Sequence, residues 1–313
     1  MLNHYTRGAG HPRLVNILAK VYSKQLQHEI HPMTNVLTSI GAFDALYTTF
    51  QALVNPGDEV IIMEPYYEPY KEICRLAGAK VVYVPLAPKE KDSNSDGWVY
   101  DFEQLQTAFS LNTKAIIVNN PMNPLGKVFT KDELQPIADL CVKYNVLCVA
   151  DEVYEYFIYG GRKHYRMATF PGMFERTLTI GSAGKTFNAT GWKVGWAIGP
   201  ENLISPLQEF HHNTIRTNPT PLQEAVAVGF ETEFERLDRA DCYFTTMSQE
   251  MEEKRDQLAG YLREAGLRPI IPSGGCFVIA DISSLERGDD TKSPGHSTRM
   301  ESIGNGYSKW TQQ

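Results

Sequence analysis

The chain has 313 residues, of which 42% are hydrophobic and 21% are charged, an ordinary composition that allows one large domain and a smaller one. Its formal net charge of −7 argues against a nucleic-acid partner, and no apolar run approaches the roughly 18 residues needed to span a membrane. The five cysteines show no metal-ligand spacing, so we expect no metal site and a reduced compartment, cytoplasmic or mitochondrial.

The first thirty residues contain a short irregular segment followed by one predicted helix. No signal peptide or basic amphipathic leader is visible, and the chain reads as if it begins late in a longer pattern. Apolar residues recur at helical spacing between residues 11 and 27, with Pro12 near the start, where proline fits the first turn. We therefore expect residues 1–30 to be the remnant of an N-terminal arm and a first helix.

Strands and helices then alternate up to about residue 200. The apolar patterns predict strands at 35–40, 59–63, 80–84, 114–118, 146–150 and 176–180, helices at 43–54, 71–77 and 130–143, and a polar loop at 88–98. This alternation is typical of an α/β domain with a mostly parallel sheet flanked by helices, which we assign to residues 31–205.

The remainder of the chain has a different character. Helices are predicted at 221–235 and 243–265, and a hairpin over 268–281 would begin a smaller, incomplete α+β domain, so that residues 206–285 form a second region. Residues 286–313 are polar and without pattern, and disorder is predicted for this tail.

Polar or flexible residues follow several of the predicted strands. Ligands of open α/β sheets bind at the carboxyl ends of the strands, where this chain places Gly41, Tyr67, Asn123, Asp151 and Lys185. A glycine turn before a helix favours an anion, a tyrosine can cover a planar ring, and a buried carboxylate needs a partner such as a pyridinium N–H. Each feature alone also fits an ordinary turn, a packed tyrosine, or an aspartate that caps the next turn.

The segment 179–196 gives the strongest single indication of chemistry. Small residues surround Lys185 and would let a bulky ligand approach the backbone, so this lysine is usable as an amine nucleophile toward an aldehyde cofactor. Ser182 and Lys193 flank it and suit a phosphate group. The alternative is a buried turn with two surface lysines.

Together, these motifs resemble the fold-type-I aminotransferases that depend on pyridoxal 5′-phosphate (PLP). The nearest likeness is to the kynurenine aminotransferase and cysteine-S-conjugate β-lyase group, which also takes glutamine. The resemblance covers about residues 3–285, and it is carried by the segments 3–8, 41–43, 65–67, 123–126, 151–154, 182–187 and 191–195. It implies the PLP-dependent transferase fold, exchange of an amino group between an amino acid and a 2-oxo acid, and β-elimination on cysteine S-conjugates as a side activity.

The resemblance also implies roles for individual residues. Lys185 is similar to the lysine that forms a Schiff base with the cofactor and moves the substrate Cα proton, and Asp151 is similar to the carboxylate that keeps the ring nitrogen protonated. Asn123 and Tyr154 match the donors to the phenolic oxygen of the cofactor. Tyr67 matches the residue that stacks on the ring.

A phosphate site and a homodimer follow from the same resemblance. The residues expected around the phosphate are Ser182, Lys193 and, through their backbone, Gly41, Ala42 and Phe43. Tyr5 is similar to the residue that reaches the phosphate of the neighbouring subunit, so complete sites would require two copies of the chain.

Some parts of the sequence depart from the family pattern. The arm that precedes Tyr5 in the family is not seen, and no residue of the tail matches the arginine that binds the substrate carboxylate. Arg216 stands where the group usually has an aromatic residue contributed across the dimer, which indicates either a shifted substrate preference or a surface arginine. A second hypothesis is therefore a non-catalytic form that binds PLP or dimerises without turnover.

Overall fold

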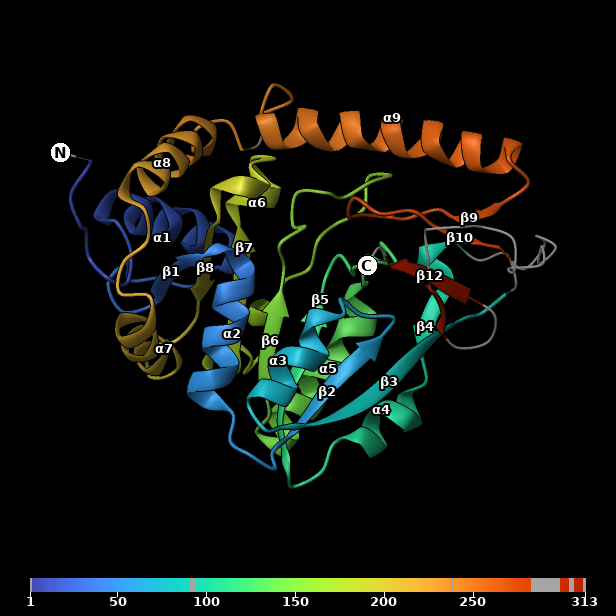
Figure 1. The fold of residues 1–313 in the computed structure, drawn as a ribbon, viewed down its shortest axis with the longest axis horizontal. Helices are drawn as coiled ribbons and strands as arrows, with labels where there is room; N and C mark the ends of the chain where they lie inside the picture. The colour runs from blue at the N-terminus through green and yellow to red at the C-terminus, as the bar shows by residue number, and fades with distance from the viewer. Residues whose placement is uncertain (1, 91–93, 238, 283–298, 304–306, 312–313) are drawn as a thin grey trace.

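The computed structural model describes residues 2–90, 94–237, 239–282, 299–303 and 307–311. Figure 1 shows a central sheet with helices on both faces and the long helix α9 (Tyr243–Glu264) crossing above its upper edge. The sheet has eight strands in the order β1-β8-β7-β6-β5-β2-β3-β4. This arrangement confirms the predicted α/β fold.

The strands of the large sheet run mostly in one direction. Their bounds are β1 (Val36–Ile40), β2 (Glu59–Glu64), β3 (Lys80–Pro88), β4 (Trp98–Tyr100), β5 (Thr113–Asn119), β6 (Leu147–Asp151), β7 (Thr177–Ser182) and β8 (Val194–Ile198). The pairings β3–β2, β2–β5, β5–β6 and β6–β7 are parallel, whereas β4, β8 and β1 pair antiparallel with their neighbours. Because β8 is antiparallel to both β7 and β1, β1 points the same way as β7. The carboxyl ends of β1, β2, β5, β6 and β7 therefore share one edge.

The predicted helices are all present, with ends within two residues of the expected ones. The helices are α1 (Pro12–Leu26), α2 (Gly41–Leu53), α3 (Pro69–Leu76), α4 (Phe102–Ala108), α5 (Lys131–Tyr144), α6 (Ala183–Thr186), α7 (Glu201–Thr214), α8 (Thr220–Phe234) and α9. The sequence patterns did not predict α4, α6 or α7. Within the described ranges, no helix combines the length and apolar character that crossing a bilayer requires.

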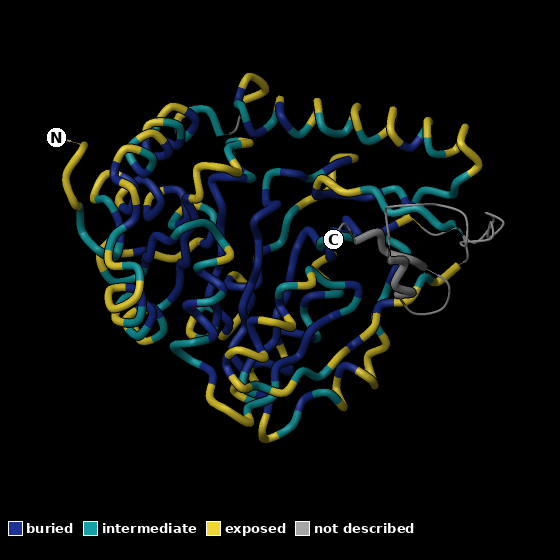
Figure 2. Tube along the Cα trace, in the orientation of Figure 1, coloured by how far each residue is buried: buried dark blue, intermediate teal, exposed yellow. Residues whose placement is uncertain are grey.

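Both faces of the sheet are buried, as Figure 2 shows by the dark centre of the molecule. In β5, Ala115 and Ile117 join the core shared with α2 and α3, whereas Ile116 and Val118 join the core shared with α4 and α5. Side chains of a strand alternate between its faces, so a central strand between two helical layers must be apolar at every position. This requirement explains the uninterrupted apolar runs in the sequence.

The predicted loop at 88–98 is shorter than expected. Strand β3 extends to Pro88, and β4 pairs with its end through Leu86 opposite Tyr100. Trp98 begins β4 and is buried against the core of the α5 side. A three-residue strand is too short to produce an alternating pattern in the sequence, which is why it was read as loop.

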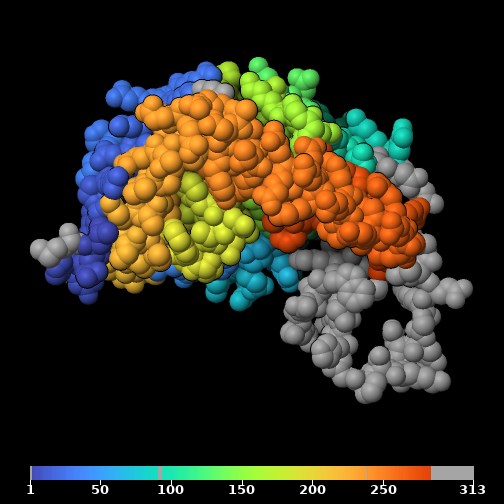
Figure 3. All heavy atoms as spheres, turned by 90° about the horizontal axis from the view of Figure 1, so that it is seen from above, coloured from blue at the N-terminus to red at the C-terminus, as the bar shows by residue number. Residues whose placement is uncertain are grey.

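The predicted C-terminal hairpin is present and reaches back to the large sheet. Strand β9 (Arg268–Ile270) pairs antiparallel with β10 (Ile279–Asp281). Between them, the N–H groups of Ser273 and Gly274 donate to the carbonyl oxygen of Gly126, at 2.8 and 2.9 Å. Helix α9 leads into this hairpin as a long ridge on the surface (Figure 3).

The tail predicted to be disordered, 286–313, lies largely outside the described residues. Two strands within it are described, β11 (Arg299–Ile303) and β12 (Tyr307–Thr311), and they pair antiparallel. For the rest of the tail, the expected disorder stays a prediction. Strands so close in sequence lose little chain entropy when they pair, and such local pairing needs no long apolar pattern.

Candidate active site

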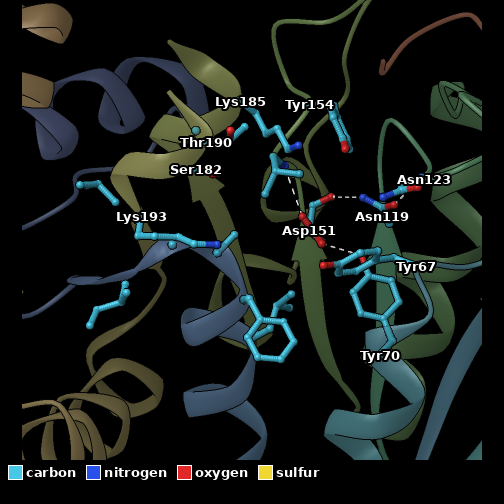
Figure 4. A pocket seen from close by; sticks show the side chains of 18 of the residues that line it. Tyr67, Tyr70, Asn119, Asn123, Asp151, Tyr154, Ser182, Lys185, Thr190 and Lys193 are labelled. Atoms are coloured by element: carbon cyan, nitrogen blue, oxygen red, sulfur yellow. Dashed lines mark hydrogen bonds between the residues drawn. The ribbon is translucent and has the colours of Figure 1, made fainter. Parts of the chain in front are cut away.

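A pocket of about 220 Å³ opens at the edge of the sheet where the parallel strands end (Figure 4). It is lined by residues that the sequence singled out, namely Gly41, Ala42, Phe43, Tyr67, Asn123, Asp151, Tyr154, Ser182, Lys185 and Lys193. These residues are far apart in the sequence, and the common direction of the strands brings them together. Tyr5, the remaining predicted site residue, is 90% exposed and does not line this pocket.

Lys185 projects into the pocket from the single turn α6, which follows β7 directly. Its Nζ lies 5.3 Å from the centre of the Tyr154 ring, a distance at which an ammonium group is attracted to the ring face. Burial raises the pKa of Asp151, and the positive charge of Lys185 opposes this rise. The lysine and the aspartate therefore line the same pocket.

Two glycines near Lys185 pack closely against other parts of the protein. A Cβ atom on Gly181 would lie 2.1 Å from Nε1 of Trp196, and one on Gly184 would lie 3.0 Å from Cα of Thr190. These glycines make room for the protein's own packing. Gly184 nevertheless lines the pocket, so the expectation that a small residue lets a ligand approach the backbone stays a prediction at this position.

Asp151 is the last residue of β6 and is only 4% exposed. Its Oδ2 accepts a hydrogen bond from the hydroxyl of Tyr70 at 2.5 Å, and its Oδ1 accepts one from the N–H of Val153 at 3.3 Å. Burial raises the pKa of Asp151 to about 6, although both hydrogen bonds and the charge of Lys185 oppose this rise. The carboxylate thus caps the next turn with one oxygen and faces the pocket with the rest.

Asn119, which the sequence analysis did not select, ties two walls of the pocket together. Its Nδ2 donates to the backbone oxygen of Asp151 at 2.9 Å, and its Oδ1 accepts from the N–H of Asn123 at 2.6 Å. Asn119 is the last residue of β5, and a polar residue at the end of an apolar strand was the available signal.

Aromatic side chains form the remaining walls. Tyr67 meets Tyr70 edge to face, with ring centres 5.4 Å apart, and Phe277 approaches from the C-terminal hairpin. The hydroxyl of Tyr154 hydrogen-bonds with the thiol of Cys276, and burial raises the pKa of Tyr154 well above its ordinary value. Phe277 and Cys276 were missed because only the fold carries this hairpin back to the sheet.

The end of the pocket at α2 is built to receive an anion. Gly41, at the start of α2, has φ +77°, and its neighbour Lys193 also has a left-handed backbone, with φ 53°. A Cβ atom on Gly195 would lie 2.4 Å from the carbonyl carbon of Gly41, so only glycine lets the strand approach this turn. The free N–H groups and dipole of α2, with Lys193 and Ser182 beside them, favour a negative charge.

The arrangement as a whole suits a flat ligand with an anionic group at one end and a basic nitrogen at the other. The helix end and Lys193 would face the anionic group, and Asp151 would face the basic nitrogen. The amine of Lys185 stands between them, available for covalent chemistry. Among the described residues, no group of histidine, cysteine, aspartate and glutamate side chains could hold a metal ion.

Arg216 lies outside the pocket. It is exposed, its φ is 71°, and its backbone oxygen packs against Gly8 near the start of the chain. Within the described ranges, no arginine side chain lines the pocket. The two interpretations of Arg216 therefore both remain predictions.

A second group of buried charges lies behind the pocket. Arg166 donates to Oε2 of Glu152 at 2.6 Å and also to Glu155, while Tyr22 donates to Oε1 of Glu155 at 2.8 Å. Nε1 of Trp196 donates to the hydroxyl of Tyr22 at 2.9 Å. We call these five residues the Arg166 cluster. It anchors the segment that carries Asp151 and Tyr154.

Comparison with known proteins gives a consistent result. A family model described as "Aminotransferase class I and II" matches residues 1–298. Kynurenine–oxoglutarate transaminase 3 of Homo sapiens is 51% identical over 288 residues, which are 91% of this chain and 63% of that protein. Kynurenine–oxoglutarate transaminase 1 of Mus musculus is 47% identical over 290 residues, 91% of this chain and 68% of that protein.

Solved structures agree with these sequence matches. Bna3p of Saccharomyces cerevisiae superposes with a TM-score of 0.87 and 36% identity, covering 94% of this chain and 69% of that one. N-succinyldiaminopimelate aminotransferase of Mycobacterium tuberculosis gives 0.85 and 36%, covering 93% and 72%. The chain spans 63% of the length of the human relative and similar shares of the others.

Proposed function

This chain belongs to the class I and II aminotransferases, and we propose that it binds PLP in this pocket and transfers the amino group of an amino acid to a 2-oxo acid. The observation that carries the proposal is the meeting of Lys185 and Asp151 at one cavity with an anion site beside them. The names of the relatives support kynurenine as the amino donor and 2-oxoglutarate as the acceptor. Glutamine as a further donor rests only on the resemblance of the sequence motifs.

The residues present fit this cofactor. The turn at Gly41, together with Ser182 and Lys193, would hold the phosphate, and the ring would lie against Tyr67. When bound, PLP supplies an aldehyde for the amine of Lys185 and a ring that accepts the electron pair released at the substrate Cα.

Asp151 would hold a proton on the ring nitrogen. Its carboxylate is buried without a basic side chain at ion-pair distance among the described residues, and burial raises its pKa to about 6. A cationic N–H placed against it supplies the missing partner, because opposite charge stabilises the ionised carboxylate. Tyr154 and Asn123 would donate hydrogen bonds to the phenolic oxygen on the same ring.

Lys185 would carry the proton that the reaction moves. Its Nζ lies in the pocket beside the Tyr154 ring, and it would take the proton from the substrate Cα and return it during transfer. Phe277 and Tyr154 would exclude water from this space, because both side chains line the pocket beside Lys185.

The proposal includes a homodimer. Tyr5 is 90% exposed and lies outside the pocket of its own chain, which is the placement expected of a residue that reaches a second copy. Phe43 at the pocket and Trp192 nearby are 50% and 42% exposed. Light scattering of the purified chain should give twice the monomer mass, and Tyr5→Ala should weaken PLP binding without unfolding the chain.

A second candidate is a chain that binds PLP without turnover. It is favoured by the finding that, in the part of the chain that the structure describes, no arginine lines the pocket. A substrate carboxylate would then lack the bidentate partner that orients it.

One experiment separates these candidates. The purified 313-residue chain is mixed with PLP, its visible absorbance is recorded, and borohydride reduction is followed by peptide mapping for modification of Lys185. Lys185→Ala should abolish the band and the modification, whereas Lys163→Ala, a surface change, should leave both. No band in the native chain would refute the proposal. Binding at Lys185 without conversion by kynurenine or glutamine would favour the second candidate.

A further inference from the structure

We propose that Tyr70 is a positioning residue of this site, whose hydroxyl holds the Asp151 carboxylate in the orientation and charge state that the reaction needs. The inference rests on the proposed function, because Tyr70 acts through the residue that would meet the ring nitrogen of PLP. The sequence analysis gave Tyr70 no role, and the structure places it at the centre of the hydrogen bonding around Asp151.

The geometry leaves Tyr70 little freedom. It is the second residue of α3, it is 2% exposed, and its N–H donates to the carbonyl oxygen of Tyr67 at 3.0 Å. Its ring meets that of Tyr67 at 83°, so one side chain supports both the aromatic wall of the pocket and the carboxylate of Asp151. A tyrosine held in this way can aim its hydroxyl at one oxygen only (Figure 4).

Four titratable side chains face Asp151 from the elements packed around it. These are Tyr70 from α3, Tyr67 from the segment before it, Tyr154 from the loop after β6, and Lys185 from α6. Burial raises the pKa of Asp151, and the largest opposing influence is the hydrogen bond from Tyr70, ahead of the Val153 N–H and the charge of Lys185. Without that hydroxyl, a larger fraction of Asp151 is protonated and neutral. A neutral carboxyl no longer favours a proton on the ring nitrogen.

The chain supplies a matched comparison in Tyr22. This tyrosine is also fully buried, and its hydroxyl also donates to a buried carboxylate, that of Glu155 at 2.8 Å. Tyr22 belongs to the Arg166 cluster and lines no part of the pocket. A structural role alone would make the two tyrosines equivalent, whereas a positioning role makes only Tyr70 matter to PLP.

The test is the pH dependence of PLP affinity, measured by titrating each apoprotein with PLP. Affinity should fall as the pH drops through the pKa of Asp151, because the charged carboxylate is the form that binds. In Tyr70→Phe this fall should begin about one pH unit higher, so that binding is about twofold weaker at pH 7 and about tenfold weaker at pH 5. Tyr22→Phe should lower the melting temperature and leave the pH profile where it is.

A fluorinated tyrosine at position 70 covers the case in which Tyr70→Phe does not fold. It keeps the shape of the side chain, and its more acidic hydroxyl is a stronger donor, so the profile should shift toward lower pH. Unchanged profiles in both variants, or an equal shift in Tyr22→Phe, would overturn the inference while leaving the proposed function intact. A native chain that binds no PLP at Lys185 would overturn both.

Discussion

Two consecutive carboxylates at the end of β6 have different surroundings. Asp151 faces the pocket, with a hydroxyl and an N–H group as its partners, whereas Glu152 faces the Arg166 cluster and receives the guanidinium of Arg166 at 2.6 Å. They are 4% and 1% exposed, and burial raises their pKa values to about 6 and about 7. Asp151 is the last residue of β6 and Glu152 is the next residue, so one position in the sequence separates the carboxylate at the pocket from the carboxylate in the Arg166 cluster.

The difference shows how this fold keeps a reactive carboxylate available. Glu152 is charge-paired by the protein itself, and the pairing secures the segment that follows β6. Asp151 has no basic side chain at ion-pair distance within the described ranges, so a bound cation would stabilise its ionised form. Such sites lower the stability of the protein in return for function, a trade-off that mutations can measure.

The largest effect should come from removing the cation of the cluster. Arg166→Met leaves the carboxylates of Glu152 and Glu155 buried without their partner, and the free energy of unfolding should fall by about 3–5 kcal/mol. Urea denaturation at pH 8 measures this loss. The loss should be smaller at pH 5, because the unpaired carboxyls bind protons in the folded state. The exposed pair of Arg162 with Asp96 is the control, since Arg162→Met should cost less than about 1 kcal/mol.

Removing the charge at the pocket should instead raise the free energy of unfolding. In the folded apoprotein the pKa of Asp151 rises from 3.8 to about 6, so the charged carboxylate destabilises the fold progressively as the pH increases between these values. Asp151→Asn should therefore stabilise the apoprotein by about 3 kcal/mol at pH 8, with no gain at pH 4, and should weaken PLP binding. Thermal melts at both pH values test this. A loss of stability at pH 8 would contradict the comparison.

A pair of neighbouring asparagines sharpens the contrast. Asn119 bridges the backbone of Asp151 and Asn123 at the pocket, while Asn120 bridges the backbone of Tyr165 and Phe129 away from it. Replacing either by alanine should cost about 2 kcal/mol, because buried backbone groups lose their partners. Only Asn119→Ala should also weaken PLP binding, which a spectral titration would detect. Equal effects on binding would mean that the pocket responds to general destabilisation.

The smallest expected loss of stability comes from a helix cap outside the pocket, and it serves as a reference for the other variants. Thr130 caps α5, far from both carboxylates, and its hydroxyl accepts from the N–H of Glu133. Thr130→Ala should lower the free energy of unfolding by about 1 kcal/mol and leave PLP affinity unchanged. A clear loss of affinity in this variant would show that stability and binding cannot be separated in this chain.

Much of the fold was predictable because its elements carry local signals. The α5 capping box and the apolar runs of the central strands are visible in the sequence and are present in the structure. Most of the missed elements lack such signals; the exception is β8, an apolar strand that was also not predicted. Helix α7 contains Pro206, α6 is a single turn, and β4 has three residues. These form because the surrounding packing decides their conformation.

The candidate site was predictable where a residue directly follows a strand. Lys185, Asp151 and Asn123 were selected on that ground, and all three line the pocket. Tyr70 was missed because nothing in its own neighbourhood marks it, and Asn119 was missed although it is a polar residue at the end of an apolar strand. A hydrogen bond between residues on different strands depends on how the sheet is ordered, and the sheet order is absent from local patterns.

The amino-acid sequence alone determined the types of element, the apolar core and the set of residues that end the strands, because each of these depends on neighbours within a few positions. Only the tertiary structure decided that Asp151 and Glu152 face different partners and that Tyr70 holds the first of them. Those assignments depend on strand order and on the packing of α3 against β6, which arise from contacts between distant parts of the chain. The distinction between the reactive carboxylate and the supporting one is therefore a property of the fold.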